Sequence, residues 1–257
     1  MAGMAEGGTT NSGPPPAPSA GARPPSGLRA LVVEDEQKLA ELLGSYLEHD
    51  GFEVTVVHDG LEAVSVGREV DPDVVILDLG LPGLDGIEVC RQLRTFSDAY
   101  VVMLTARTDE VDTLIGLSVG ADDYMTKPFS PRELMARVQA MFRRPRPVAT
   151  ADAAVDGARH FGGLTVDALG RDVWLDGKSV ALTRTEFDLL ATLSEYPRMA
   201  FSRRQMIEAV WGPSWVGDEH LVDVHIGHLR RKLNDDPTEG RFVRTVRGVG
   251  YRMGAGQ

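Results

Sequence analysis

Short apolar segments alternate with longer amphipathic segments over residues 28–144. The apolar segments predict β-strands at 28–33, 52–57, 74–79, 100–105 and about 124–126. Helical spacing predicts helices at 36–49, 60–69, 85–96, 109–119 and 131–143. Residues 74–79 are apolar almost without alternation, as expected of a strand covered on both faces. The alternation of strands and helices therefore predicts an α/β domain with a doubly wound, five-stranded parallel sheet.

The second half of the chain has a different pattern. Its first segment, from about residue 158, contains β-like pieces separated by Asp-Gly turn signals. Helical spacing follows at 183–194, 202–210 and 219–233, and 242–253 predicts a terminal hairpin that turns near 248–250. Capping-box sequences precede the first two of these helices. An α+β domain is therefore expected.

Composition separates these two regions from their surroundings. Residues 1–27 are mostly Gly, Pro, Ala, Ser and Thr, which predicts a disordered tail. Residues 145–157 are typical of a linker. The predicted organisation is a tail at 1–27, a first domain at 28–144, a linker at 145–157 and a second domain at 158–254.

Charge is distributed unevenly between the two domains. Residues 28–144 hold 22 acidic and 11 basic side chains, whereas 198–252 hold seven acidic and ten basic ones. This asymmetry indicates different partners for the two halves. The single cysteine excludes an internal disulfide. Because no signal peptide or membrane-spanning apolar segment is visible, we expect a soluble, cytoplasmic protein without membrane contact.

Functional side chains follow the predicted strands of the first domain. Glu34 and Asp35 follow the first strand, Asp78 ends the third, Thr105 ends the fourth and Lys127 follows the fifth. The carboxyl ends of parallel strands meet at one edge of the sheet. Taken singly, each residue is more often a helix start, a turn residue or a surface group. Their joint placement predicts a site.

Three neighbouring carboxylates repel one another, and a bound cation relieves that repulsion. An all-oxygen set with open positions suits Mg²⁺, to which the backbone carbonyl of Gly80 adds a further ligand. Asp78 would be the nucleophile that forms an aspartyl phosphate. Lys127 and Thr105 would contact the transferred oxygens. A haloacid-dehalogenase-like phosphatase is disfavoured, because Gly80 stands where that class has its second aspartate.

Residues 28–144 resemble the CheY-like receiver domain of two-component response regulators. The motifs that carry the resemblance are LVVEDE, VVILDLGLPGLDG, VVMLTAR and GADDYMTKPF. The resemblance implies that Asp78 accepts phosphate from a sensor histidine kinase, with Mg²⁺ on Glu34, Asp35 and Asp78. Such a domain catalyses only its own phosphoryl transfer and dephosphorylation, so it is not an enzyme with external substrates.

The same resemblance assigns two further features of the first domain. Thr105 and Tyr124 would form the switch pair that reports phosphorylation, and the Lys127–Pro128 peptide bond would be cis. Phosphorylated members of the family form homodimers through the fourth helix, fifth strand and fifth helix. The charged residues expected on that face are Asp122, Asp123, Glu133, Arg137 and Arg144. Thr113 and Ser118 replace charges common in the family, which predicts a weaker dimer.

The predicted helix at 219–233 has an apolar face made of Val222, Ile226, Leu229 and Leu233. The opposite face would present His220, Val224, Gly227, His228 and Arg231, with Arg230 and Lys232 on the flanks. Such a helix suits the major groove of DNA, and Arg247 in the terminal hairpin suits the minor groove. The alternative is an ordinary solvated amphipathic helix. A zinc site is rejected because the histidines of this helix do not converge on one face.

Residues 160–253 resemble the winged-helix domain of the OmpR/PhoB family. The motifs are LTRTEFDLLATL, SRRQMIEAVWG, VDVHIGHLRRKL and TVRGVGYRM. With His225 at a family position, the candidate DNA contacts are His220, Val224, His225, Gly227, His228, Arg230, Arg231 and Arg247. His220 and Gly227 depart from the family's usual residues. The loop 211–219 would contact RNA polymerase, with Trp211 in the core and Trp215 exposed.

The function expected from these patterns is a phosphorylation-switched transcription factor that binds tandem half-sites on double-stranded DNA. The alternative is an orphan DNA-binding regulator that works without phosphorylation. The intact phosphorylation positions argue against that alternative. A signalling adaptor without DNA binding is disfavoured by the basic helix and the hairpin.

Overall fold

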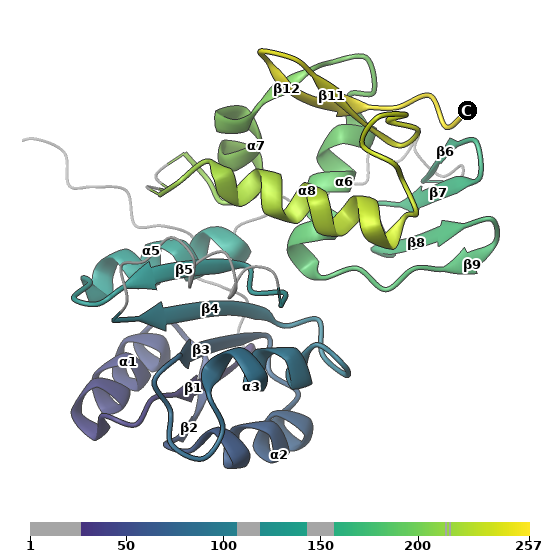
Figure 1. Cartoon of the computed structure of the whole chain (residues 1–257). Helices are drawn as coiled ribbons and strands as arrows, with labels where there is room; N and C mark the ends of the chain where they lie inside the picture. The colour runs from purple at the N-terminus through teal and green to yellow at the C-terminus, as the bar shows by residue number, and fades with distance from the viewer. Residues whose placement is uncertain (1–26, 107–118, 143–156, 214, 216) are drawn as a thin grey trace, which may run out of the picture.

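Two domains make up the part of the chain that the structure, a computed structural model, describes (Figure 1). The described residues are 27–106, 119–142, 157–213, 215 and 217–257. The expected tail and linker lie almost wholly outside these residues, as does nearly all of the helix expected at 109–119. Thr113, Ser118 and Arg144 also lie outside them.

The first domain is built on a five-stranded sheet in the order β2-β1-β3-β4-β5, in which all neighbouring strands are parallel. The strands are β1 (Arg29–Val33), β2 (Glu53–Val57), β3 (Val74–Asp78), β4 (Tyr100–Thr105) and β5 (Asp123–Thr126). The helices are α1 (Gln37–His49), α2 (Gly60–Val70), α3 (Gly86–Leu93) and α5 (Pro131–Phe142). Contacts join α1 to α5 and α2 to α3, on the two faces of the sheet (Figure 1). The predicted doubly wound α/β fold is confirmed.

The apolar centre of this sheet fixes the position of Asp78. All five residues of β3 are buried, and Asp78 is the last of them. A glycine is required at Gly86, because a Cβ there would collide with the Asp78 carbonyl oxygen. The absence of that Cβ lets α3 begin directly beside the end of β3.

The second domain joins two small antiparallel sheets to three helices. Its first sheet has the strands β6 (Ala158–Phe161), β7 (Leu164–Asp167), β8 (Asp172–Leu175) and β9 (Lys178–Ser179). The helices are α6 (Arg184–Glu195), α7 (Arg203–Val210) and α8 (His220–Lys232). The second sheet has β10 (Phe201–Ser202), β11 (Val243–Val246) and β12 (Gly250–Met253), with β12 in the centre. Both predicted capping boxes, at Thr183 and Ser202, are present.

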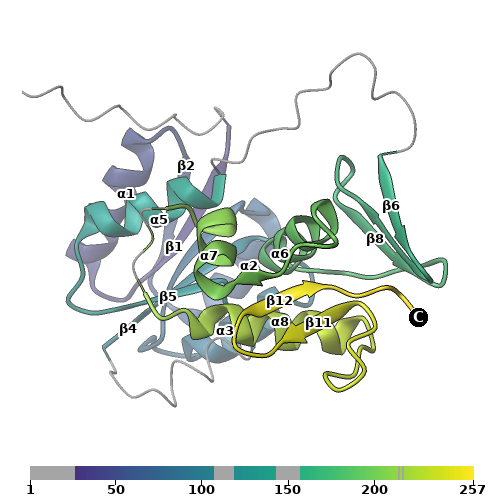
Figure 2. The same cartoon turned by 90° about the horizontal axis from the view of Figure 1, so that it is seen from above.

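Helix α8 lies on the side of the second domain that faces the first domain, near β5 (Figure 1). Its predicted apolar face is confirmed, since Val222, Ile226, Leu229 and Leu233 are fully buried. In the view from above the β11–β12 hairpin overlies part of α8 (Figure 2), and Arg230 of α8 donates to the Val243 carbonyl of β11. None of the helices in the described part of the chain is both long enough and apolar enough to cross a membrane.

Candidate functional site

Three carboxylates meet at the carboxyl edge of the parallel sheet. Oxygen atoms of Glu34, Asp35 and Asp78 all lie within 4.8 Å of one another. Glu34 and Asp78 are buried, whereas Asp35 is exposed. We call these three residues the acidic cluster. Their convergence follows from the register, because Val33 pairs with Leu77 on the neighbouring parallel strand.

Lys127 balances part of this charge. Its Nζ donates hydrogen bonds to Glu34 Oε1 and Oε2 at 2.9 and 2.8 Å, and to Asp78 Oδ2 at 3.0 Å. The backbone N–H of Lys127 donates to the Thr105 carbonyl at 2.6 Å, which fixes this residue beside β4. The Lys127–Pro128 peptide bond is cis, as predicted.

Burial disfavours ionisation in the acidic cluster. Burial raises the pKa of Glu34, as does the negative charge of Asp78, and the hydrogen bond from Lys127 only partly opposes them. Burial lowers the pKa of Lys127, but the hydrogen bonds to Glu34 and Asp78 outweigh it, so this pKa is raised. One ammonium thus serves two buried carboxylates, and an added cation would stabilise their ionised forms.

A cavity of about 270 Å³ opens beside Asp78. Thr105, Lys127 and Gly80 line it together with Asp78. A Cβ at Gly80 would lie 3.7 Å from Asp78 Oδ2, so the glycine keeps this side of the carboxylate clear. Three clustered carboxylates beside an open cavity are a donor set that fits Mg²⁺, which prefers oxygen ligands and retains waters.

The residues of the predicted switch pair occupy different surroundings. Thr105 is 2 % exposed at the end of β4 and lines the cavity beside Asp78. Tyr124 lies on β5 and lines another cavity, of about 220 Å³, together with Arg137 and Trp215. This second cavity is therefore lined by residues of both domains, since Trp215 belongs to the second.

The predicted DNA-contacting residues separate into exposed and buried groups. His220, Gly227, Arg231 and Arg247 are exposed, and Val224 is half-buried. His225, His228 and Arg230 are buried. Arg230 was expected on an exposed flank, but it donates two hydrogen bonds to the Val243 carbonyl and one to Thr245 Oγ1. The β11–β12 hairpin folds over this guanidinium, which a helical projection of α8 alone does not reveal.

Comparison with known proteins agrees with both halves of this geometry. Residues 30–139 match the family described as "Response regulator receiver domain", and 177–253 match "Transcriptional regulatory protein, C terminal". The DNA-binding response regulator MtrA of Mycolicibacterium smegmatis is 45% identical over 226 residues, 88% of this chain and 96% of MtrA. This chain is a response regulator of the OmpR/PhoB family.

Two further relatives support this assignment. Sensory transduction protein RegX3 of Mycolicibacterium smegmatis is 44% identical over 223 residues, which is 87% of this chain and 97% of that protein. Among solved structures, a RitR mutant is 30% identical with a TM-score of 0.71, covering 88% of this chain and 98% of that one. The likeness to the RitR structure extends over both domains.

The DNA-binding domain covers part of the receiver through Trp215. This residue was expected to be exposed, and that expectation is wrong: it is 3 % exposed. Its Nε1–H donates to Asp123 Oδ2 at 3.1 Å, and the Arg137 guanidinium lies 5.4 Å from its ring centre. Arg137 also pairs with Asp123 at 3.0 Å and with Glu133 at 2.9 Å. Three of the charged residues expected on the dimer face therefore lie at or beside this contact.

Helix α8 contacts the same side of the receiver. His225 is 1 % exposed, and its Nε2 lies 3.2 Å from the Asp122 carbonyl oxygen, to which it donates. The Asp122 carboxylate pairs with Arg94 at 2.5 Å. In this arrangement His225 faces protein rather than solvent, although the sequence placed it among candidate DNA contacts.

Helix α6 makes a third contact between the domains. Arg184 pairs with Asp73 at 3.2 Å and with Asp98 at 3.5 Å. The Tyr100 hydroxyl donates to Asp188 Oδ2 at 3.0 Å. Sequence reasoning missed all five residues, because nothing in their local pattern marks them as contacts between domains. We call the contacts through Trp215, His225 and Arg184 the domain contact, and the arrangement it holds the closed arrangement.

Proposed function

We propose that this response regulator is a transcription factor switched by phosphorylation of Asp78. A sensor histidine kinase would supply the phosphoryl group. The observation that carries the proposal is the Lys127 ammonium shared by Glu34 and Asp78 at the edge of a cavity. A buried carboxylate with this cation and open space beside it is suited to become an acyl phosphate.

In the proposed transfer, an Asp78 carboxylate oxygen attacks the phosphorus of a phosphohistidine. The P–N bond breaks as the P–O bond forms, and the imidazole leaves with the electron pair of the broken bond. Lys127 donates a hydrogen bond to Asp78 Oδ2 and would pair with a phosphoryl oxygen after the transfer. The Thr105 side chain would donate a hydrogen bond to another. Mg²⁺ held by the acidic cluster and the Gly80 carbonyl would neutralise charge on the transferred oxygens.

The proposed output is separation of the domains. In the closed arrangement the domain contact covers Asp123 and Arg137 of the receiver and His225 of α8. Opening would free the β5–α5 face for homodimerisation and would free α8 for DNA. Two recognition helices in one dimer would then read tandem half-sites. The candidate DNA contacts that are exposed or half-buried are His220, Val224, Gly227, Arg231 and Arg247. Opening would uncover His225, whereas Arg230 is bound to the β11–β12 hairpin.

An orphan regulator that binds DNA without phosphorylation is the second candidate. The domain contact weighs against it, because His225 holds α8 against the receiver, which would have to move away before this helix could enter a groove. The polymerase contact proposed for the loop 211–219 would also require opening, since Trp215 of this loop is bound to Asp123.

The test is sedimentation velocity of the full chain with Mg²⁺, with and without beryllofluoride, beside Asp78→Asn. Beryllofluoride mimics the phosphoryl group on an aspartate. We expect dimers only in the wild type with beryllofluoride, because the asparagine offers no carboxylate. Equal dimerisation of Asp78→Asn under both conditions would contradict the proposal and favour the orphan reading.

A further inference from the structure

Two histidines of α8 lie at the junction of the domains, and the proposed function uses neither as an acid or a base. His225 is enclosed between the Asp122 carbonyl of the receiver and the Trp211 ring, whose centre is 5.7 Å away. The ring of His228 lies 6.2 Å from that of His225. We call these two residues the histidine pair.

The acidic groups that face the histidine pair are already bound to cations. From the receiver, Asp122 pairs with Arg94. From α6, Glu186 pairs with Lys232 at 2.7 Å, and its other oxygen is 4.0 Å from His228 Nδ1. The remaining charged neighbour on α8, Arg231, is itself positive.

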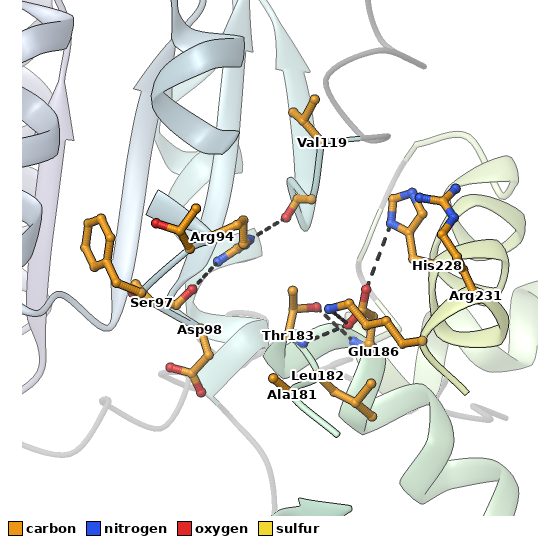
Figure 3. A pocket seen from close by; sticks show the side chains of 14 residues that line it. Arg94, Ser97, Asp98, Val119, Ala181, Leu182, Thr183, Glu186, His228 and Arg231 are labelled. Atoms are coloured by element: carbon orange, nitrogen blue, oxygen red, sulfur yellow. Dashed lines mark hydrogen bonds and ion pairs between the residues drawn. The ribbon is translucent and has the colours of Figure 1, made fainter. Parts of the chain in front are cut away.

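Solvent reaches one member of the pair. A cavity of about 560 Å³ lies between the domains, lined by Arg94 and Gly120 of the receiver and by Glu186, His228 and Arg231 of the DNA-binding domain. Asp98 also lines it and is paired with Arg184. Figure 3 shows the His228 ring directed toward the Glu186 carboxylate inside this cavity. A proton can therefore arrive at His228 while the domains remain in contact.

We propose that the histidine pair makes the closed arrangement sensitive to pH: proton uptake by either ring separates the domains and exposes α8 without phosphorylation. A protonated His225 would be a buried cation against Trp211 and a second imidazole. A protonated His228 would repel Arg231 and Lys232 on its own helix. Glu186 is 4.0 Å from His228, but because Lys232 already pairs with its other oxygen, it offsets only part of this charge. The inference rests on the opening that the proposed function assumes.

The direction of the effect follows from linkage. Burial lowers the pKa of His225, and burial together with the nearby His225 lowers the pKa of His228 to about 4. In the open form, rings exposed to water would titrate near about 6.5. The closed form therefore binds fewer protons, so its advantage is complete above pH ~6.5 and is lost as the pH falls toward about 4. If opening restores the whole pKa shift of His228, the open-to-closed ratio rises about tenfold between pH 8 and pH 5.5, and His225 changes the ratio in the same direction.

The test follows domain separation in the full chain without Mg²⁺ or a phosphoryl donor. Tryptophan emission is recorded from pH 8 to pH 5 in a Trp174→Phe background, so that Trp211 and Trp215 report the domain contact. We expect a shift to longer wavelength on acidification, together with a lower sedimentation coefficient. Wavelength rather than intensity is used, because a protonated imidazole beside Trp211 also quenches it. Far-UV circular dichroism must stay constant, so that acid unfolding is excluded.

The variants assign the transition to its residues. His225→Gln/His228→Gln retains an amide that can donate to Asp122 but cannot titrate, and it should stay closed to pH 5. If this variant is already open at pH 8, His228→Gln alone decides, because it should reduce the number of protons coupled to opening from about two to about one. His160→Gln removes an exposed histidine of β6 and should behave as the wild type. An unchanged transition in His228→Gln would overturn the proposal.

Beryllofluoride at pH 8, with Mg²⁺, separates this inference from the proposed function. Opening by beryllofluoride without opening by acid would overturn the pH-dependent device and leave the phosphorylation switch intact. Opening by acid but not by beryllofluoride would support the histidine pair and count against the phosphorylation switch.

Discussion

The acidic cluster and the domain contact are both rich in buried charge, but their charges are balanced differently. In the acidic cluster, one lysine amine serves two of three clustered carboxylates. In the domain contact, Asp122 has Arg94 and Asp123 has Arg137. An excess of buried negative charge favours binding of a cation, whereas paired charges favour a contact that holds without a ligand. Under the proposed function, the first region would receive the phosphoryl group and the second would hold the closed arrangement until then.

The largest effect should come from breaking the domain contact at Trp215. Trp215→Ala removes a buried aromatic ring and the hydrogen bond to Asp123. We expect the closed-to-open equilibrium to shift by about 3 kcal/mol, or roughly a hundredfold. Hydrogen exchange of peptides from α8 and α5, without beryllofluoride, should become faster. Tyr196→Ala removes an exposed aromatic side chain of the same domain and serves as the control. Unchanged protection of α8 in Trp215→Ala would show that Trp215 does not hold the domains together.

Arg230 tests whether a paired, buried cation is structural. Arg230→Ala leaves the buried Val243 carbonyl without its guanidinium partner. We expect the free energy of unfolding to fall by about 2 kcal/mol, as measured by thermal denaturation of the full chain. Arg231→Ala, at an exposed neighbour, should stay within about 0.5 kcal/mol of the wild type.

The same two variants separate stability from DNA contact. With beryllofluoride and a random-sequence duplex, Arg231→Ala should reduce the salt slope of binding by about 0.9, as expected for one lost phosphate contact. Arg230→Ala should leave that slope unchanged. A loss of slope in Arg230→Ala instead would restore Arg230 to the set of DNA contacts expected from the sequence.

The excess negative charge of the acidic cluster predicts that each carboxylate contributes to its affinity for Mg²⁺. Asp35→Asn removes one carboxylate, and calorimetric titration should show Mg²⁺ affinity reduced by about tenfold. Glu36→Gln removes an exposed carboxylate one residue further on and should have a much smaller effect. Because the pKa of Glu34 is raised, protons compete with the metal at a higher pH than for an ordinary glutamate. Wild-type affinity should therefore fall as the solution is acidified.

The smallest expected effect concerns the partly exposed end of the domain contact. The side chain of Arg184 is 23% exposed, and its pairs with Asp73 and Asp98 are screened by solvent. Arg184→Ala should destabilise the closed arrangement by about 0.2–1 kcal/mol, which lowers the closed-to-open ratio at most about fivefold. Hydrogen exchange of α6 measures this change, with Arg198→Ala as the control. A change as large as that of Trp215→Ala would mean that ion pairs, rather than the buried aromatic ring, dominate the contact.

The predicted strands and helices followed local patterns, and the structure confirms them within a few residues where it describes them. The capping boxes at Thr183 and Ser202 show why, since each depends on side chains only three residues apart. The exposure of Trp215 was predicted wrongly for the opposite reason. Its loop, WGPSWVGDE, has no periodic pattern that indicates burial, and its partner Asp123 is 92 residues away.

The sequence by itself determined the acidic cluster of this protein. Parallel strands gather their carboxyl ends at one edge, so residues placed at the ends of apolar segments must meet there. Only the tertiary structure decided that α8 faces the receiver and that Trp215, His225 and Arg230 are buried. His225 and Asp122 are separated by 103 residues and belong to different domains. Such contacts depend on how two finished surfaces fit together, which no periodicity within either domain encodes.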